Sequence, residues 1–174
     1  DLEKVLAETK TTTIMATHDR NEALRLSDRI AVMEGGRIAQ IDRPAVVMNR
    51  PVDEFVASFV GTETILEGEV RDVNETALIV HVNGSVIEVV GKGKPGEQVV
   101  LCIRPENVTL SIPDGSVKTS ARNVFRGRIG RIVPLGLFHR VEISCGFPLV
   151  AYVTTHALED LALRESTEVT ASVK

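Results

Sequence analysis

The chain has 174 residues, of which 43% are hydrophobic, and its formal net charge is −4 at pH 7. This length suits one or two small domains, each with a modest core. The negative charge and the lack of a basic tract argue against a nucleic-acid surface. No apolar run reaches the length of a membrane-spanning helix and no signal peptide opens the chain, so we expect no direct membrane insertion.

Sulfur and imidazole chemistry also gives few candidates. Cys102 and Cys145 lie far apart on strand-like runs, which is typical of reduced core residues and not of a disulfide framework. His81, His139 and His156 lack the spacing of metal ligands. We therefore expect no metal site.

The first segment has the pattern of part of a parallel α/β sheet. Residues 1–10 carry apolar side chains at helical spacing, and residues 11–17 form a β-branched, apolar run that predicts a strand covered on both faces. His18 and Asp19 follow at the carboxyl end of this strand, where ligands of open α/β sheets collect and a ring nitrogen can reach a phosphate. The residues alone leave open that His18 is only a polar residue flanking the next helix. Asp19 and Glu22 have the spacing of a capping box for a short helix over 21–26.

A hairpin and two helices follow. Residues 29–34 and 37–42 are strand-like runs joined by Gly35-Gly36, a pair that tolerates the positive φ of a tight turn. Prolines in the first helical turn predict helices over 43–49 and 50–59. The second predicted helix has an apolar stripe that we expect to be core, made of Val52, Phe55, Val56 and Phe59.

The sequence pattern changes from helical spacing to short strand-like runs at Gly61 to Thr64, and this stretch is the predicted domain boundary. Beyond it, short strand-like runs with turn signals predict a small barrel. They cover Leu66–Val73, Ala77–Val82, Ser85–Val90, Val99–Arg104 and Val108–Ile112, with a tight turn at Asn83-Gly84.

The pattern of this barrel then repeats. Glu67–Val70 is echoed by Arg126–Ile129, and Gly96–Arg104 by Ser166–Lys174, so that Arg104 and Lys174 fall in register. Two barrel halves of one design are implied, the second with an added helix over 156–163. We expect an open sheet edge at Lys174 that can pair with another copy.

A small polar loop over 118–123 precedes the long strand of the second half. Successive backbone N–H groups of such a loop can point at an anion. The Ser120 hydroxyl and the five-donor fork of Arg122 suit a tetrahedral dianion, and Lys174 can add a point charge. The residues alone leave open a plain turn, in which Ser120 and Asn123 satisfy local backbone groups and Arg122 is solvated.

The run ATHDRNEALRLSDRIAVMEGGRIAQIDRPAVVMNRPVDEFVASFVG resembles the part of an ABC-importer ATPase subunit from the switch histidine to the end of the nucleotide-binding domain. The resemblance implies that His18 is the catalytic switch histidine that contacts the γ-phosphate, with ATP and Mg²⁺ as cofactors of the intact subunit. Walker A, Walker B and signature motifs are absent from this sequence. We therefore expect the chain alone to be inactive, as the C-terminal portion of a longer ATPase.

Ser-Ala-Arg-Asn, the segment VTTHALEDLAL and the final Ser-Val-Lys resemble the Mop-type molybdate- and tungstate-binding domain. This resemblance implies oxyanion contacts, in a site formed between two copies of the chain. The residues carried over are Ser120, Ala121, Arg122, Asn123, Thr154 and Lys174.

Together the two resemblances imply an α/β remnant of an ABC ATPase domain over 1–61, followed by an all-β, OB-like TOBE/Mop double barrel with halves 62–115 and 116–174. The implied function is ABC import of molybdate or tungstate, with a tail that binds the oxyanion and regulates transport. The implied partners are a second copy and the membrane permease, at the cytoplasmic face of the cell membrane. Two alternatives stay open: a free-standing molybdate- or tungstate-binding storage or sensor module, and an ATPase for sulfate, iron, sugar or polyamine import with a structural tail.

Overall fold

The computed structural model describes residues 2–9, 11–113 and 120–173. The chain divides into two compact units, residues 1–61 and 62–174. Within the described residues no helix is both long and apolar enough to cross a membrane.

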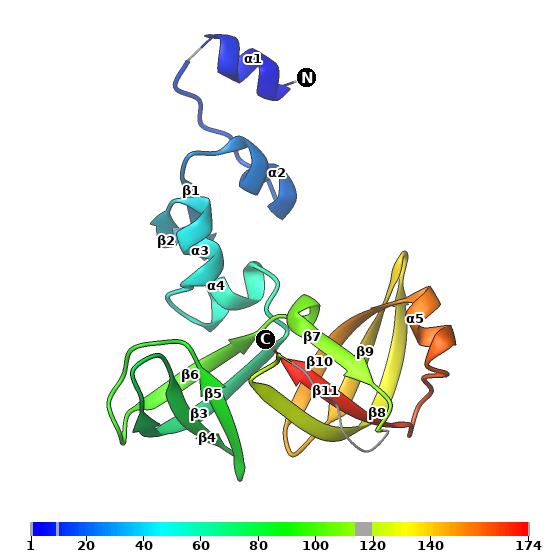
Figure 1. Cartoon of the computed structure of the whole chain (residues 1–174). Coiled ribbons are helices and arrows are strands. Elements are labelled where there is room, and N and C mark those ends of the chain that lie inside the picture. The colour runs from blue at the N-terminus through cyan, green and yellow to red at the C-terminus, as the bar shows by residue number, and fades with distance from the viewer. Residues whose placement is uncertain (1, 10, 114–119, 174) are drawn as a thin grey trace. The chain divides into compact units, whose positions relative to one another are not determined.

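The described residues of the first unit form four short helices and one hairpin (Figure 1). Its buried cluster is small and consists of Val32, Val47, Val56 and Val60. The elements are α1 (Leu2–Thr9), α2 (Arg20–Leu26), β1 (Ile30–Glu34), β2 (Arg37–Asp42), α3 (Pro44–Asn49) and α4 (Glu54–Phe59).

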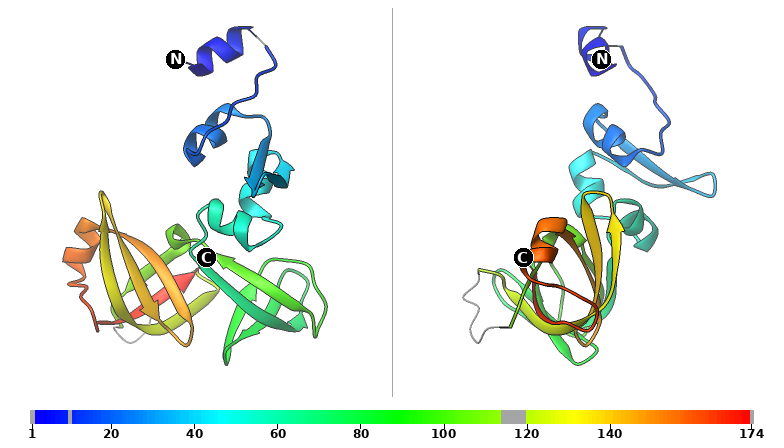
Figure 2. Two further views of the ribbon diagram at one scale, coloured as in Figure 1. Left: turned by 180° about the vertical axis from the view of Figure 1, so that it is seen from behind. Right: turned by 90° about the vertical axis from the view of Figure 1, so that its right-hand side faces the viewer.

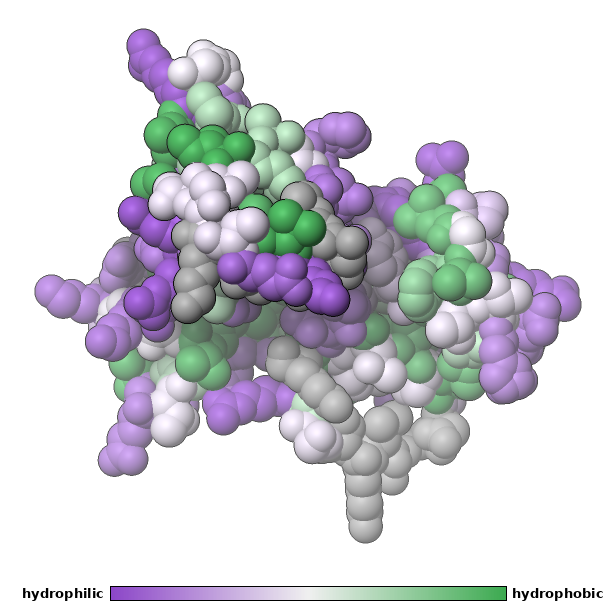
Figure 3. Space-filling model, turned by 90° about the horizontal axis from the view of Figure 1, so that it is seen from above, coloured by the Kyte–Doolittle hydropathy of each residue, from purple (hydrophilic) through white to green (hydrophobic). Residues whose placement is uncertain are grey.

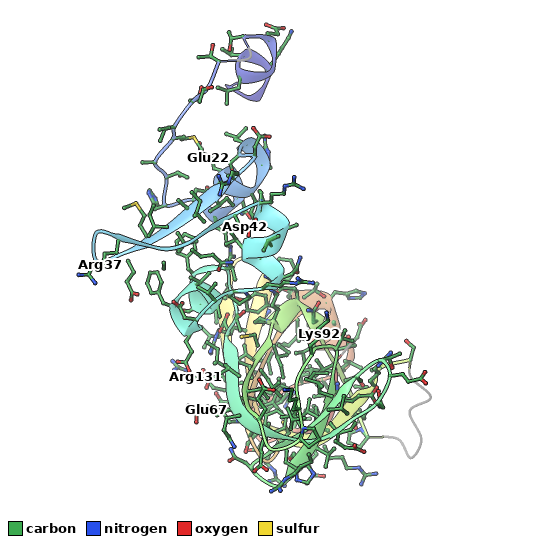
Figure 4. The ribbon with its side chains drawn as sticks, turned by 90° about the vertical axis from the view of Figure 1, so that its left-hand side faces the viewer. Glu22, Arg37, Asp42, Glu67, Lys92 and Arg131 are labelled. Carbon is green, nitrogen blue, oxygen red and sulfur yellow. The ribbon has the colours of Figure 1, made fainter. Side chains whose placement is uncertain are left out.

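The hairpin is the predicted one. Glu34 pairs with Arg37, so Gly35 and Gly36 form a two-residue turn, with φ of +54° and +80°. Both angles lie in the left-handed region, which glycine adopts without a steric penalty. The Arg37 side chain lies at the tip of the hairpin and points away from it (Figure 4).

The predicted strand over 11–17 is wrong. These residues form no strand, and Ile14 is 98% exposed. A buried parallel strand needs neighbours that satisfy its backbone groups, whereas β1 and β2 pair only with each other. Further apolar side chains of this unit are exposed, among them Met33, Ile38 and Ile41. The space-filling view shows hydrophobic surface interspersed with hydrophilic residues (Figure 3).

The predicted cap of α2 forms, but the capping box does not close. Asp19 Oδ1 accepts hydrogen bonds from the backbone N–H groups of Asn21 (2.8 Å) and Glu22 (3.2 Å). The Glu22 carboxylate instead accepts from Thr17 Oγ1 at 2.6 Å, and Thr17 Oγ1 accepts from Asp19 N at 3.0 Å. The Thr17 hydroxyl therefore bridges the Asp19 backbone N–H and the Glu22 carboxylate, which would bond directly in a closed capping box.

Of the two helices predicted to begin at a proline, one begins where it was expected and the other does not. Helix α3 begins at Pro44 as predicted. Helix α4 begins only at Glu54, because the Asp53 side chain accepts from Val56 N at 2.8 Å and caps it there. In the predicted apolar stripe Val56 is buried, but Val52 is 62% and Phe59 41% exposed. The expectation that the whole stripe is core is therefore wrong.

The second unit is mostly β and contains two curled sheets (Figures 1 and 2). One has the order β5-β4-β3-β6 and the other β10-β9-β8-β11-β7. The elements are β3 (Thr64–Val73), β4 (Leu78–Val82), β5 (Ser85–Val89), β6 (Gln98–Ile103), the 3₁₀ turn η1 (Pro105–Asn107), β7 (Val108–Ser111), β8 (Asn123–Leu135), β9 (Phe138–Ser144), β10 (Pro148–Thr154), α5 (Thr155–Asp160) and β11 (Glu168–Val173).

A single hydrophobic core joins the two sheets. Val70 and Val80 of the first sheet belong to the same buried cluster as Ile129 and Val169 of the second. Cys145 is also in this core, where burial raises the pKa of its thiol. Cys102 is exposed, so the prediction that it is a core residue is wrong. It lies on the outward face of β6, because Leu101 and Ile103 beside it point inward.

The predicted repeat is confirmed by the hydrogen bonds. Strand β3 has an irregularity between Val70 and Asp72, and β8 has one between Ile129 and Arg131. Val70 donates its backbone N–H to the carbonyl oxygen of Glu97, just ahead of β6, at 2.9 Å. Ile129 donates in the same way to Thr167, just ahead of β11, at 3.0 Å. The two halves therefore share strand pairing as well as sequence pattern.

Each half also has a glycine where two strands approach closely. A Cβ atom on Gly68 would lie 2.6 Å from Val80, and one on Gly127 would lie 2.8 Å from Ile143. The carbonyl oxygens of His81 and Ser144 would lie 2.9 and 2.8 Å from the same two Cβ atoms. Only glycine fits at these positions without moving backbone.

Strand β7 crosses from one half to the other. It belongs to the first half in sequence, but it pairs with β11, from Val108 opposite Val173 to Ser111 opposite Thr170. Strand β11 also pairs with β8. Strand β7 therefore covers the edge of β11 over residues 170–173, whereas the open edge predicted at Lys174 lies outside the described residues.

Candidate functional site

The candidate loop leads into β8, and the structure describes four of its residues. Ser120 and Arg122 are exposed, Ala121 is half-buried, and Asn123 is 8% exposed and begins the strand. The rest of the loop, 118–119, and Lys174 lie outside the described residues. Val173 pairs with Asn123, so the end of β11 lies beside the start of β8.

Asn123 fixes this loop to the other sheet. Its Nδ2 donates to the backbone oxygen of Glu88, and its Oδ1 accepts from the backbone N–H of Glu88, both at 2.8 Å. The side-chain amide thus imitates a neighbouring strand for β5. It satisfies backbone groups, as the plain-turn alternative holds, but those groups lie on a strand that is distant in sequence.

Arg122 is not simply solvated. Its Nη1 donates to Glu88 Oε1 at 2.7 Å, and the side chains are 48% and 33% exposed. The guanidinium has five N–H donors, so a bond at Nη1 leaves most of the fork for a further acceptor. Exposed ion pairs contribute about 0.2–1 kcal/mol. An incoming anion can therefore displace Glu88 at low cost.

Thr154 lies elsewhere in the sheet. It pairs with Phe138, which pairs with Leu135 at the end of β8 opposite to Asn123. Its Oγ1 accepts from Ala157 N at 3.2 Å and caps α5. One chain therefore does not bring Thr154 to the Ser120–Asn123 loop.

The predicted switch histidine, His18, is not part of a metal-ligand cluster among the described residues. His18 is exposed and lies on a bend before α2. The sequence contains no Walker A glycine-rich loop that would hold phosphates beside it. Within the described part of the chain, no group of three His, Cys, Asp or Glu residues is placed to hold a metal ion.

Sequence reasoning missed a second polar cluster, which is centred on Glu63. Tyr152 Oη donates to one oxygen of Glu63 and Arg140 Nε to the other, while Arg140 Nη1 donates to Glu142. Burial, followed by the hydrogen bond to Glu63, raises the pKa of Tyr152 to about 12. The two carboxylates also raise the pKa of Arg140. These residues are scattered over three strand-like segments, and the repeat is the one sequence signal that relates Glu63 to Arg122.

Comparison with known proteins identifies the class of the second half. Residues 119–174 match the TOBE domain family. The fold of the unit agrees, since the solved structure of the cytoplasmic molybdate-binding protein ModG aligns with a TM-score of 0.57 and covers 65% of this chain and 91% of ModG. At 20% identity this likeness establishes the fold, and the all-β, OB-like prediction is confirmed.

Relatives extend the match to the first unit. The molybdate/tungstate import ATP-binding protein WtpC of Pyrococcus abyssi is 38% identical over 168 residues, which is 94% of this chain and 45% of that protein. WtpC of Pyrococcus horikoshii matches equally. The spermidine/putrescine import ATP-binding protein PotA of Trichormus variabilis is 42% identical over 130 residues, 72% of this chain and 33% of PotA.

The chain thus matches part of ABC importer ATP-binding subunits and includes a TOBE domain, in agreement with the predicted family. It spans about half the length of the molybdate/tungstate relatives.

Proposed function

We propose that the chain is the C-terminal portion of an ATP-binding subunit that energises import of molybdate or tungstate, and that its tail binds the oxyanion and regulates transport. The observation that carries this proposal is the exposed Arg122 fork beside Ser120, at the place where β8 begins and β11 ends. Similarity to WtpC over 94% of the chain supports the same cargo. We assign 1–61 to the ATPase domain, and 62–115 and 116–174 to the two halves of the tail.

The chemistry of the loop suits a tetrahedral dianion, whose oxygens only accept hydrogen bonds. Ser120 supplies a hydroxyl donor, Arg122 supplies a charged fork, and the backbone of Ala121 adds to the loop. Hydrogen bonds to charged groups contribute about 1.5–3 kcal/mol each. Three or four of them, after desolvation losses, support roughly micromolar binding.

A second copy completes the site in this proposal. Thr154 lies at the opposite end of β8 from Ser120, so both can contact one anion only if Thr154 comes from a partner chain. Lys174 adds the remaining positive charge. A dimer that closes around the anion would have higher affinity for it than an open dimer, and this difference lets binding shift the transport cycle. The permease and the cytoplasmic face of the membrane are the proposed setting.

Titration calorimetry with tungstate, molybdate, sulfate and spermidine, together with the mass in solution, tests the proposal. We expect a dimer that binds the first two ions. The Arg122→Ala variant should lose this binding at unchanged thermal stability, because its bond to Glu88 is exposed. Arg131→Ala, at an exposed arginine farther along β8, is the matched control. Unchanged affinity in Arg122→Ala overturns the site.

Polyamine import is the second candidate, since PotA proteins are also similar. A polycation is recognised by carboxylates, and Arg122 would repel it. Because this candidate has a structural tail, a folded chain that binds none of the four ligands in the same titration would favour it.

A further inference from the structure

The repeat places an acidic residue in the first half where the second half has Arg122. Thr64 begins β3 and pairs with Ile103, just as Asn123 begins β8 and pairs with Val173. Thr64 and Asn123 are therefore equivalent positions. The residues before them, Glu63 and Arg122, are equivalent too.

The equivalence extends to what these residues contact. Asn123 bonds the backbone of Glu88 in β5, and Thr64 Oγ1 accepts from Val150 N in β10 at 3.0 Å. Strand β5 is the last strand of the first hairpin, and β10 holds the same place in the second. In each half, the first residue of the long strand thus bonds the backbone of a strand in the other half. The residue before it is acidic in the first half (Glu63) and basic in the second (Arg122).

Glu63 occupies donors that an external anion would use. Its two oxygens accept from the phenol of Tyr152 and from Nε of Arg140. The Glu63 and Arg140 side chains are only 23% and 26% exposed. A phenol and a guanidinium converging on one carboxylate resemble the hydroxyl and guanidinium of Ser120 and Arg122 in chemical type.

We infer that the first half contains a second anion-binding position, closed by the carboxylate of Glu63 in place of a ligand. A dianion approaching Arg140 meets the negative charges of Glu63 and Glu142, which repel it. Each chain then offers one open oxyanion position, at Arg122. The number of one open position per chain rests on the proposed function. The inference that Glu63 closes the position in the first half does not.

Removal of Glu63 tests the inference. In equilibrium dialysis with molybdate, the wild-type chain should bind about one ion per chain and Glu63→Ser about two. The added site should persist in the Glu63→Ser/Arg122→Ala double variant and disappear when Tyr152→Phe and Arg140→Gln are added to it. The matched control is Glu142→Gln, which removes the other carboxylate on Arg140 but leaves Glu63 in place, and should gain no site.

The outcomes separate the two proposals. A wild-type chain that binds nothing, with a gain of one site in Glu63→Ser, sinks the Arg122 site and supports the closed position. A folded Glu63→Ser chain with unchanged stoichiometry overturns the closed position. Should Glu63→Ser fail to fold, formate or molybdate should restore its β-sheet circular dichroism by replacing the lost carboxylate, and absence of any such rescue also overturns it.

Discussion

At the scale of single residues, Tyr152 offers a direct view of the Glu63 cluster. It is the one tyrosine of a chain without tryptophan. Its phenol is partly buried and donates to Glu63, and its pKa is raised from 10 to about 12. Ultraviolet absorbance and fluorescence of the protein therefore report on this cluster without any label.

We predict a loss of stability in alkaline solution that depends on Tyr152. The folded chain holds the phenolic proton more tightly than the unfolded chain, so this contribution is complete below about pH 10 and is lost as the pH rises toward 12. Denaturant unfolding at several pH values measures it. The Tyr152→Phe variant should show a flatter profile over this interval, and identical profiles would contradict the raised pKa.

Glu88 has two separate roles, and substitution can divide them. Its backbone holds Asn123, whereas its carboxylate holds Arg122. We predict that Glu88→Gln leaves the fold intact and strengthens molybdate binding by up to about fivefold, because the competing ion pair contributes no more than about 1 kcal/mol. Calorimetry measures the affinity.

Asn123→Ala is the companion variant for the backbone role. It removes the partner of two partly buried backbone groups of Glu88, so we expect a loss of about 2 kcal/mol in the free energy of unfolding. A Glu88→Gln chain that is equally destabilised would refute the division of roles.

At the scale of elements, the paired glycines explain why each half can curl. The backbones of β3 and β4, and of β8 and β9, approach too closely for a side chain at Gly68 or Gly127. We predict that Gly127→Ala lowers the free energy of unfolding by about 1–3 kcal/mol, since a Cβ there meets the carbonyl oxygen of Ser144 and cannot be accommodated by a rotamer change.

Gly136→Ala is the control in thermal denaturation. No atom lies within 4 Å of a Cβ at Gly136, although its φ is +66°, so the cost there is that of backbone strain alone. A smaller effect at Gly127 than at Gly136 would argue against the close approach.

Elements coded by near neighbours could be predicted from the sequence, and those set by distant partners could not. The Gly35-Gly36 turn and the Asp19 cap depend on residues within a few positions. The run 11–17 has the composition of a buried strand, yet composition does not supply the strands that must flank it. The same limit hid the pairing of β7 with β11.

The candidate site shows the same division. The polar loop was visible as Ser120 to Asn123, because residue type alone marks it. The contacts of Asn123 and Arg122 with Glu88 join residues 35 and 34 positions apart. The sequence around these residues contains no pattern that predicts such contacts. The Glu63 cluster joins segments still farther apart.

At the scale of the whole molecule, the two units differ in the size of their cores. The second unit has a continuous buried cluster that spans both of its sheets, whereas the buried hydrophobic cluster described in the first unit consists of four valines. We predict that amide hydrogens over 11–17 exchange fastest and that those of β8 and β9 exchange slowest, as measured by mass spectrometry. Protection of 11–17 equal to that of β8 would contradict the exposed state of this run.

The pairing of β7 with a strand of the other half affects how the chain folds during synthesis. During synthesis β7 emerges well before β11, the strand that it pairs with. Until β11 has emerged, β7 and β8 each present a row of unpaired backbone groups, which invites aggregation. The first half therefore cannot finish folding on the ribosome ahead of the second, and a stop codon before residue 168 should yield insoluble protein instead of a stable half.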